Sequence, residues 1–323
     1  MPFALININL LASIMGALLL QACSSTSQDA KKIHAKTSDN GIATISDTDS
    51  LSIKNSKNVI IDSNLPMPTV NPVESDGTKG ATVVALAIMP GLYRTPAAIS
   101  FIRCAETHGL HFHLYTGFEM GAVLAAMAAF EISPDKIEWI FYKFMQKTKN
   151  FKAYSPEWLL AAREELLGIF VNKKIEDAPK TLLLPVYDRL DKKVIFLKKG
   201  ALVPALEANL RIYPSKGSSW SSAATWDMSS REILTKNSAD KIIRLEFFDR
   251  AFEPKVKDVS LSPGWKKIWG ISLEGLQNSA DIFISLPLDD GMLDEALDIP
   301  HLFKKTREYC DSMIEEVKSK VSF

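Results

Sequence analysis

Glu119 stands midway between two glycines, Gly117 and Gly121, at the point where a strand-like segment gives way to a helical one. Residues 112–116 have strand character, and residues 121–129 are rich in small helix-forming side chains. A strand that turns sharply into a helix needs glycine on both sides of the turn residue, because the two elements come too close for side chains. The pattern therefore predicts that Glu119 lies at the tip of this turn, exposed at the end of a sheet strand.

The same strand, turn and helix surround the serine of the G-x-S-x-G nucleophile elbow. Here Glu119 takes the place of that serine. A carboxylate does not replace a serine alkoxide in acyl transfer, because its attack gives a mixed anhydride and the turn is shaped for a shorter side chain. The motif therefore indicates a hydrolase scaffold whose nucleophile is missing.

The segment upstream of the turn contains a buried strand, a loop and a helix. Residues 82–88 form a continuous apolar run of the kind found in parallel strands buried on both faces. The loop that follows holds Pro90, Gly91 and Arg94, and a helix is expected over residues 96–108. This order resembles the patatin-like acyl hydrolases, whose glycine-rich oxyanion loop follows the first strand and retains a basic residue.

The resemblance continues downstream and covers roughly residues 81–320. It implies an α/β protein with a three-layer α/β/α patatin-like fold and a mainly parallel central sheet. Further strands are expected at 182–186, 241–247 and 280–287, a strand and turn at 194–200, and further helices at 201–210 and 301–320. Asp227 falls where the family has the aspartate of its Ser–Asp dyad, but the glycines that follow that aspartate are absent here.

The resemblance assigns the candidate site. Glu119 occupies the nucleophile position, Asp227 the dyad position, and Gly91 and Arg94 are what remains of the oxyanion loop. Because Pro90 has no N–H and the other loop glycines are replaced, we expect several oxyanion donors to be missing or mis-aimed. The loss of serine, loop glycines and dyad glycines together predicts an inactive protein. The alternative is an active lipid acyl hydrolase that uses an atypical nucleophile or a water activated by Glu119.

Simpler interpretations of the same residues stay open. Asp227 is a common turn residue, Arg94 suits a solvated loop, and Glu119 near Arg94 would form an exposed ion pair of little worth. His111 and His113 share one face of a strand, but no partner ligand accompanies them at a recognisable spacing. We therefore expect ordinary strand histidines, no metal and no cofactor.

The amino terminus resembles a bacterial lipoprotein signal peptide over residues 1–22. An apolar core leads to small or aliphatic residues before Cys23, which would be lipidated after cleavage. The segment lacks the usual Lys or Arg at its start, and a plain membrane-spanning helix is the alternative. That alternative is weakened because Asn7 and Asn9 interrupt a run that is short for a bilayer. Ser24 after the cysteine resembles lipoproteins passed on to the outer membrane, facing the periplasm.

Residues 23–80 are rich in Ser, Thr, Asn, Asp and Lys without helical period, which predicts a disordered tether. Residues 81–323 then form one patatin-like domain. A formal net charge of zero and the lack of a basic stripe argue against a nucleic-acid partner. The expected partners are the membrane through Cys23, and either an acyl-chain ligand or an envelope protein.

Two cysteines remain after lipidation, Cys104 in the first helix of the domain and Cys310 in the last. An envelope location would permit a disulfide between them. Pairing requires Cα atoms within about 7 Å, which a sequence does not reveal. We expect two buried, unpaired cysteines.

Overall fold

The computed structural model describes residues 82–212, 218–248, 265, 267–269, 271, 280–286 and 298–322. All of them belong to the second of two units into which the chain divides, Leu51–Phe323. The predicted signal peptide, Cys23 and the tether lie outside the described residues. Within the described part of the chain, every helix is too short or too polar to cross a bilayer.

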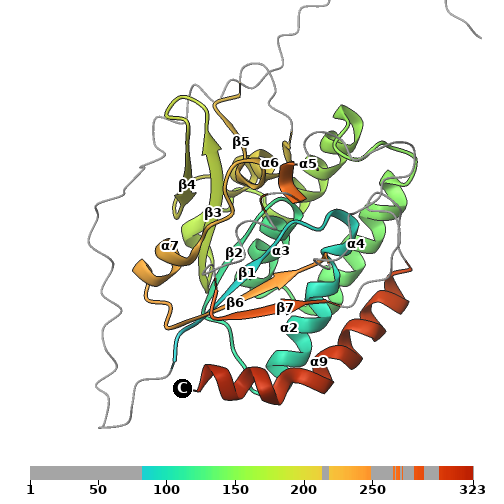
Figure 1. The fold of residues 1–323 in the computed structure, drawn as a ribbon. Helices are drawn as coiled ribbons and strands as arrows, with labels where there is room; N and C mark the ends of the chain where they lie inside the picture. The colour runs from blue at the N-terminus through green and yellow to red at the C-terminus, as the bar shows by residue number, and fades with distance from the viewer. Residues whose placement is uncertain are drawn as a thin grey trace, which may run out of the picture. The chain divides into compact units, whose positions relative to one another are not determined.

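One sheet forms the centre of the domain (Figure 1). Its strands are β1 (Val84–Ile88), β2 (Leu114–Gly117), β3 (Thr181–Asp188), β4 (Lys193–Leu197), β5 (Trp220–Ser222), β6 (Lys241–Glu246) and β7 (Ile282–Ser285). The strand order is β4-β3-β2-β1-β6-β7, and β5 pairs with β3. The pairs between β3, β2, β1, β6 and β7 are parallel, whereas β4 and β5 run antiparallel to β3. The mainly parallel sheet predicted from the sequence is therefore confirmed.

Helices cover both faces of the sheet, as the predicted α/β/α class requires (Figure 1). They are α2 (Ala97–Thr107), α3 (Met120–Ala129), α4 (Pro134–Thr148), α5 (Pro156–Phe170), α6 (Leu202–Leu210), α7 (Arg231–Lys236) and α9 (Ile299–Val321). Short 3-10 turns occur at η3 (Leu92–Arg94), η4 (Ile175–Asp177) and η5 (Ala223–Thr225). The helices predicted over 96–108, 121–129, 201–210 and 301–320 are all present.

The burial of each element follows from its composition. All five residues of β1 are buried, as expected of a central parallel strand. In α3, nine of ten residues are buried, because this helix of small and apolar side chains packs on the centre of the sheet. In contrast, α9 is amphipathic and buries one stripe against α2, beside which it lies in Figure 1.

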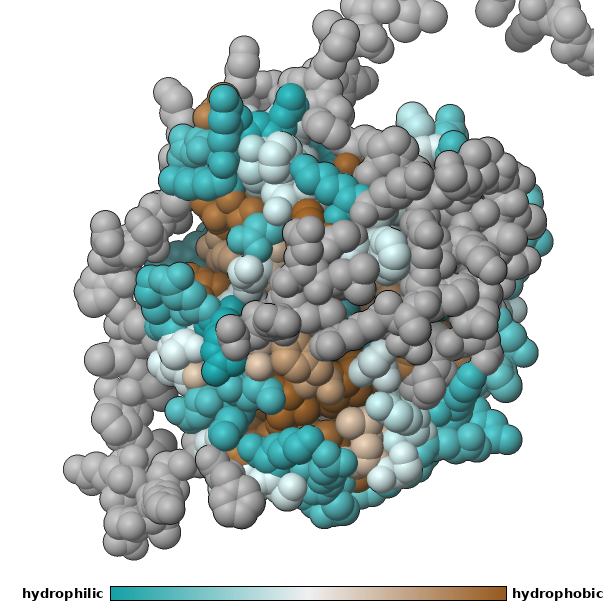
Figure 2. Space-filling model, in the orientation of Figure 1, coloured by the Kyte–Doolittle hydropathy of each residue, from teal (hydrophilic) through white to brown (hydrophobic). Residues whose placement is uncertain are grey.

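Apolar residues also reach the surface in places. In the view of Figure 2, brown apolar residues gather near the middle of the molecule, around the position of β6 and β7 in Figure 1. Teal hydrophilic residues border them along the lower rim. The core is continuous, since the buried apolar side chains of the sheet and of the helices belong to one cluster.

The register of the parallel strands brings three chain segments to one edge of the sheet. Ile88 at the end of β1 pairs with Gly117 at the end of β2 and with Leu245 near the end of β6. The loop after β1 and the turn after β2 therefore leave the sheet side by side. In open α/β sheets, this carboxyl edge is where ligands bind.

Candidate functional site

The turn after β2 has the geometry that the two glycines predict. Glu119 lies between β2 and α3 with φ 58° and ψ −126°, a left-handed conformation that side-chain-bearing residues rarely adopt. A Cβ added at Gly117 would come within 2.1 Å of the Gly121 carbonyl oxygen. A Cβ added at Gly121 would come within 2.3 Å of the Ile88 carbonyl oxygen. Both glycines are therefore required by the close approach of strand and helix.

The side chain of Glu119 is fully buried, with 0% of its surface exposed, so the predicted exposed position is wrong. Its Oε2 accepts hydrogen bonds from the backbone N–H of Gly91 (3.2 Å) and of Leu92 (3.1 Å). Its Oε1 accepts a hydrogen bond of 2.5 Å from the hydroxyl of Tyr154. The carboxyl group is enclosed because the loop after β1 and the connection between α4 and α5 both close over the turn. The interpretation of Glu119 as a surface carboxylate is excluded by the same burial.

The loop after β1 retains two converging N–H donors, so the expectation that its donors are missing or mis-aimed is also wrong. Although Pro90 offers no N–H, those of Gly91 and Leu92 point at one oxygen atom. Leu92 reaches this orientation with φ 45°. Two adjacent backbone donors on one oxygen is the arrangement of an oxyanion hole. In this chain, the oxygen that they hold belongs to Glu119 itself.

Gly91 and Arg94, the two loop residues assigned from the resemblance, are both buried in the core. A Cβ added at Gly91 would meet the ring of Phe247 at 2.7 Å, so a larger residue would force the loop outward. Arg94 is only 3% exposed, and its guanidinium carbon lies 5.9 Å from the centroid of the Phe248 ring. The interpretation of Arg94 as a solvated loop residue is therefore wrong.

Tyr154 is the site residue that the sequence did not reveal. It lies in the connection between α4 and α5 with φ 62°, and its ring packs against Trp158 at 5.0 Å and Trp265 at 6.2 Å between centroids. Trp158 is fully buried and donates through Nε1 to the hydroxyl of Tyr93 (2.8 Å), which lies 3.4 Å from Thr148 Oγ1. These aromatic and hydroxyl contacts hold the Tyr154 hydroxyl in place over the carboxyl group.

Backbone strain is concentrated at this cluster. Leu92, Glu119 and Tyr154 are three of the seven non-glycine residues with positive φ in the described part of the chain. Each such residue costs about 1–3 kcal/mol, so it persists only where its surroundings enforce the conformation. The three strained residues meet through the hydrogen bonds to one carboxyl group. The strain therefore marks the turn as a site, although the chemistry of a serine elbow is absent.

The environment of the carboxyl group disfavours its charge. Burial raises the pKa of Glu119 to about 7, and the hydrogen bonds from Tyr154 and from the backbone N–H groups oppose this rise. Near neutral pH, the group therefore exists in both protonation states. A group with this pKa can exchange a proton, but all its described contacts are protein atoms.

No contact between Asp227 and Glu119 is found among the described residues. Its side chain is exposed, and its Oδ1 accepts a 2.7 Å hydrogen bond from the backbone N–H of Ser229, as a turn residue does. The preceding residue, Trp226, stacks on Tyr187 with ring centroids 3.9 Å apart. The hydrogen bonds described for Glu119 come from other segments. The structure therefore favours the turn interpretation of Asp227 over a dyad partner.

A small apolar cavity adjoins the turn on the far side of Met120. Its volume is about 30 Å³, and side chains of α3, α4 and α5 line it. This volume holds about one or two water-sized groups, whereas ligand pockets measure roughly 300–1,000 Å³. The cavity is therefore far too small for an acyl chain.

The two cysteines form a disulfide, so the expectation of unpaired thiols is wrong. The sulfur atoms of Cys104 and Cys310 are bonded, and their Cα atoms are 6.3 Å apart, within the usual range. The bond ties α2 to α9, helices that are separated by most of the domain sequence. Both residues are buried, with exposed fractions of 3% and 0%.

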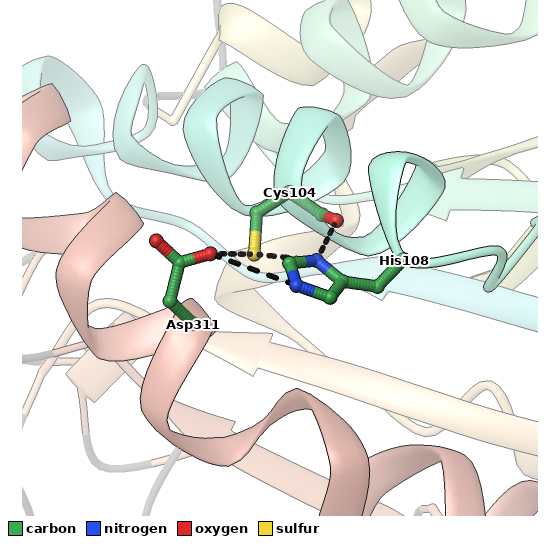
Figure 3. A group of neighbouring side chains, drawn as sticks. All are labelled: Cys104, His108 and Asp311. Atoms are coloured by element: carbon green, nitrogen blue, oxygen red, sulfur yellow. Dashed lines mark hydrogen bonds and ion pairs between the residues drawn. The ribbon is translucent and has the colours of Figure 1, made fainter.

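One group of side chains near this disulfide has the spacing of metal ligands. Figure 3 shows Cys104 from α2 and His108, which directly follows α2, facing Asp311 from α9. His108 Nδ1 lies 2.9 Å from the Cys104 carbonyl oxygen, and Asp311 Oδ1 lies 3.4 Å from Cys104 Sγ. A disulfide sulfur is not a thiolate, and the thiolate is the form of cysteine that binds metals. With the disulfide formed, the group keeps only two ligands.

Of the two histidines before β2, His113 has a structural role. Its Nδ1 accepts a 3.2 Å hydrogen bond from the backbone N–H of Val84, next to the start of β1. Burial lowers the pKa of His113, and the charges of Lys180 and His111 act in the same direction. His113 is therefore held as a neutral acceptor.

Comparisons with known proteins give a distant structural likeness. Neither a protein-family model nor a curated protein matches the sequence. A structure of the heterodimeric ExoU–SpcU complex from the type III secretion system of Pseudomonas aeruginosa matches with a TM-score of 0.40 and 12% identity, over 75% of this chain and 52% of that chain. A crystal structure of the type III effector protein ExoU matches with a TM-score of 0.38 and 9% identity, over 72% and 53%. The chain thus spans about half the length of the chains it matches, and a likeness this low carries no conclusion about activity.

Proposed function

We propose that this chain is a lipid-anchored, patatin-like protein that does not hydrolyse esters and acts by binding. The observation that carries the proposal is the contact of Glu119 Oε2 with the backbone N–H groups of Gly91 and Leu92. A substrate carbonyl would need these two donors in the transition state. The chain fills that position with its own carboxyl group, and no serine is present at the turn.

The surroundings of the carboxyl group support inactivity further. The Tyr154 hydroxyl caps the second carboxyl oxygen at 2.5 Å, and the side chain of Glu119 is inaccessible to solvent. A bound ester would have to displace Tyr154 and break three hydrogen bonds. Catalysis requires donors that are free when charge develops on the substrate, and these are occupied.

Between the two classes of binding partner, an envelope protein is better supported than an acyl chain. The cavity beside Met120 has a volume of about 30 Å³, which excludes an acyl chain there. On the surface of α4, Trp139 and Tyr142 are 58% and 42% exposed, and their rings stack with centroids 5.6 Å apart. Exposed Trp and Tyr side chains are typical of protein interfaces.

The proposed anchor is Cys23, and the proposed location is the outer membrane, facing the periplasm. The Cys104–Cys310 disulfide supports a compartment outside the reducing cytosol. In a bacterial host, the wild-type chain should incorporate a fatty-acid probe and sediment with membranes, and Cys23→Ala should abolish both. Ala22→Gly, which keeps the modified cysteine and a small residue before it, serves as the control. Labelling that persists in Cys23→Ala would refute the anchor.

Hydrolysis assays test the central proposal. We expect the purified full chain to release no fatty acid from phospholipid vesicles or short-chain esters above a mock preparation. We expect the same of Glu119→Ser, because Asp227 is exposed and its one described hydrogen bond is to Ser229, so nothing holds it against a serine at the turn. Turnover by Glu119→Ser would show that Gly91 and Leu92 form a working oxyanion hole once the carboxyl group is removed.

An active hydrolase that uses Glu119 as a general base is the second candidate. The raised pKa of Glu119, about 7, favours it, because a base works best with a pKa near the ambient pH. In that case, the wild-type chain would show turnover, and Glu119→Gln would abolish it without loss of folding. Absence of turnover in the wild-type chain removes this candidate.

A further inference from the structure

A second cavity lies near the amino end of β2, whereas Glu119 follows the carboxyl end of that strand. We call it the Tyr115 pocket, because Tyr115 of β2 lines it together with residues of α2, α3 and α4. Helix α3 begins beside Glu119, and Glu131 at the rim of the pocket follows its other end, so about 15 Å of helix separates the two places. The volume of the Tyr115 pocket is about 350 Å³, which falls within the range of small-molecule sites.

The inner wall of the Tyr115 pocket is apolar except for one hydroxyl group. Side chains of Ile99 and Ile102 from α2, Leu124 from α3 and Ile137 from α4 form this wall. Tyr115 itself is only 2% exposed, its hydroxyl makes no hydrogen bond to any other described residue, and the hydroxyl oxygen is accessible from the pocket. A hydroxyl that opens into a pocket and has no protein partner can donate to, or accept from, a bound group. The wall is therefore built for an apolar group with one polar end.

Charged side chains surround this hydroxyl at the rim. Lys180 pairs with Glu131, with Nζ 3.6 Å from Oε1. Glu106 also lines the pocket, and it forms no ion pair with any residue in the described part of the chain. Two carboxylates against one ammonium group leave one negative charge unmatched, and that charge belongs to Glu106.

The pKa shifts of Glu106 and Tyr115 are consistent with an excess of negative charge at the rim. Burial raises the pKa of Glu106, with His111 and Lys180 opposing the rise and Glu131 adding to it. Burial also raises the pKa of the Tyr115 hydroxyl, and the charges of Glu106 and Glu131 act in the same direction. Both groups therefore lie in a region where added positive charge is favourable and where the tyrosine stays protonated.

We propose that the Tyr115 pocket binds a small organic monocation, a primary amine on an apolar chain. The ammonium group would donate hydrogen bonds to the carboxylate of Glu106 and to the hydroxyl oxygen of Tyr115. The chain would lie against Ile99, Ile102 and Leu124. Charge-assisted hydrogen bonds of this kind are stronger than those between neutral groups, so Glu106 decides the class of ligand.

Calorimetric titration of three matched six-carbon probes tests this proposal. The full chain is reconstituted in phosphatidylcholine nanodiscs, with empty nanodiscs as the blank, and hexylamine, hexanol and hexanoate are titrated separately. We expect saturable binding of hexylamine, at least tenfold tighter than that of hexanol or hexanoate. Glu106→Gln, an isosteric change at an exposed rim position, should weaken hexylamine binding tenfold or more. Tyr115→Phe should weaken it severalfold.

A control variant and three contrary outcomes complete the test. Glu315→Gln removes a carboxylate on α9, outside the Tyr115 pocket, and should leave hexylamine binding unchanged. Equal binding of hexylamine and hexanol would show that charge is not recognised. Preference for hexanoate would show that Lys180 or His111 selects the ligand instead. No saturable binding of hexylamine would refute the site altogether.

Discussion

The two carboxylates assigned from the sequence to one catalytic pair have opposite environments. Glu119 is fully buried and accepts three hydrogen bonds from two distant segments, whereas Asp227 is exposed and accepts one from the second residue after it. In a working dyad, both groups would meet at one substrate atom. Here the first is bound to backbone and tyrosine donors inside the domain, and the described hydrogen bond of the second lies within its own turn.

This contrast shows how a strand–turn–helix of this shape is satisfied by a glutamate at its tip. The elbow still needs its glycines and its strained residue, because strand and helix approach each other closely. The converging N–H groups of Gly91 and Leu92 still need an acceptor, since a buried donor without one costs about 1–3 kcal/mol. Glu119 provides that acceptor from within the chain. The two donors are therefore satisfied without any bound ligand.

The largest expected effect is the part of the pH dependence of stability that Glu119 contributes. Its pKa is raised from 4.5 to about 7 in the folded chain, so the folded state holds the proton more tightly than the unfolded state does. The corresponding stability is complete below pH 4.5 and is lost as the pH rises through 7, by about 3 kcal/mol. Urea unfolding of the wild-type chain should show this decline, and Glu119→Gln should lack it. If the free energy of unfolding depended on pH in the same way in the wild-type chain and in Glu119→Gln, the raised pKa of Glu119 would be refuted.

A slightly smaller effect is expected when the acceptor is removed. At pH 5, where the buried group is mostly protonated, Glu119→Ala leaves the N–H groups of Gly91 and Leu92 and the hydroxyl of Tyr154 without their acceptor. We expect a loss of about 2–3 kcal/mol in the free energy of unfolding, measured with urea. The matched change Asp227→Ala should cost far less. Should Glu119→Ala unfold at the same urea concentration as wild type, the hydrogen bonds would contribute nothing to stability.

The sheet and most of its helices were predictable because their signals are local. The buried strand before Pro90 and the glycines of the turn define β1, β2 and α3. The amphipathic stripe of α9 and the apolar runs of β3 and β6 are equally readable. Burial pattern and turn chemistry act over a few residues, so a sequence displays them directly.

The chemistry of the site was less predictable because its contacts are long-range. Tyr154 lies 35 positions from Glu119 and belongs to a connection between two helices that carries no motif. The donors of the loop are backbone N–H groups, which every residue except proline has, so only the conformation of Leu92 reveals them. The disulfide joins residues separated by 206 positions. In each case, the fold decides what meets, and the residue types alone do not.

A smaller effect should follow from Tyr154→Phe, which removes one hydrogen bond and keeps the ring packed against Trp158 and Trp265. We expect a loss of about 1–2 kcal/mol in the free energy of unfolding at pH 7. Because the Tyr154 hydroxyl lowers the pKa of Glu119, its removal should also shift the pH-dependent decline of stability upward. Urea unfolding between pH 5 and pH 9 measures both. A decline at unchanged pH would mean that the hydroxyl does not stabilise the ionised carboxylate.

The smallest effect is expected at Asp227, and it tests the other half of the comparison. Its one described hydrogen bond, to the N–H of Ser229, is exposed to water, and the neighbouring stack of Trp226 on Tyr187 does not depend on its carboxylate. Asp227→Ala should therefore cost about 0.5 kcal/mol, and Asp227→Asn less, because the amide oxygen can still accept from the turn. Urea unfolding at pH 7 checks both variants. A loss above about 2 kcal/mol in Asp227→Ala, or a changed pH profile of Glu119 in either variant, would show that the two carboxylates are coupled after all, as a dyad requires.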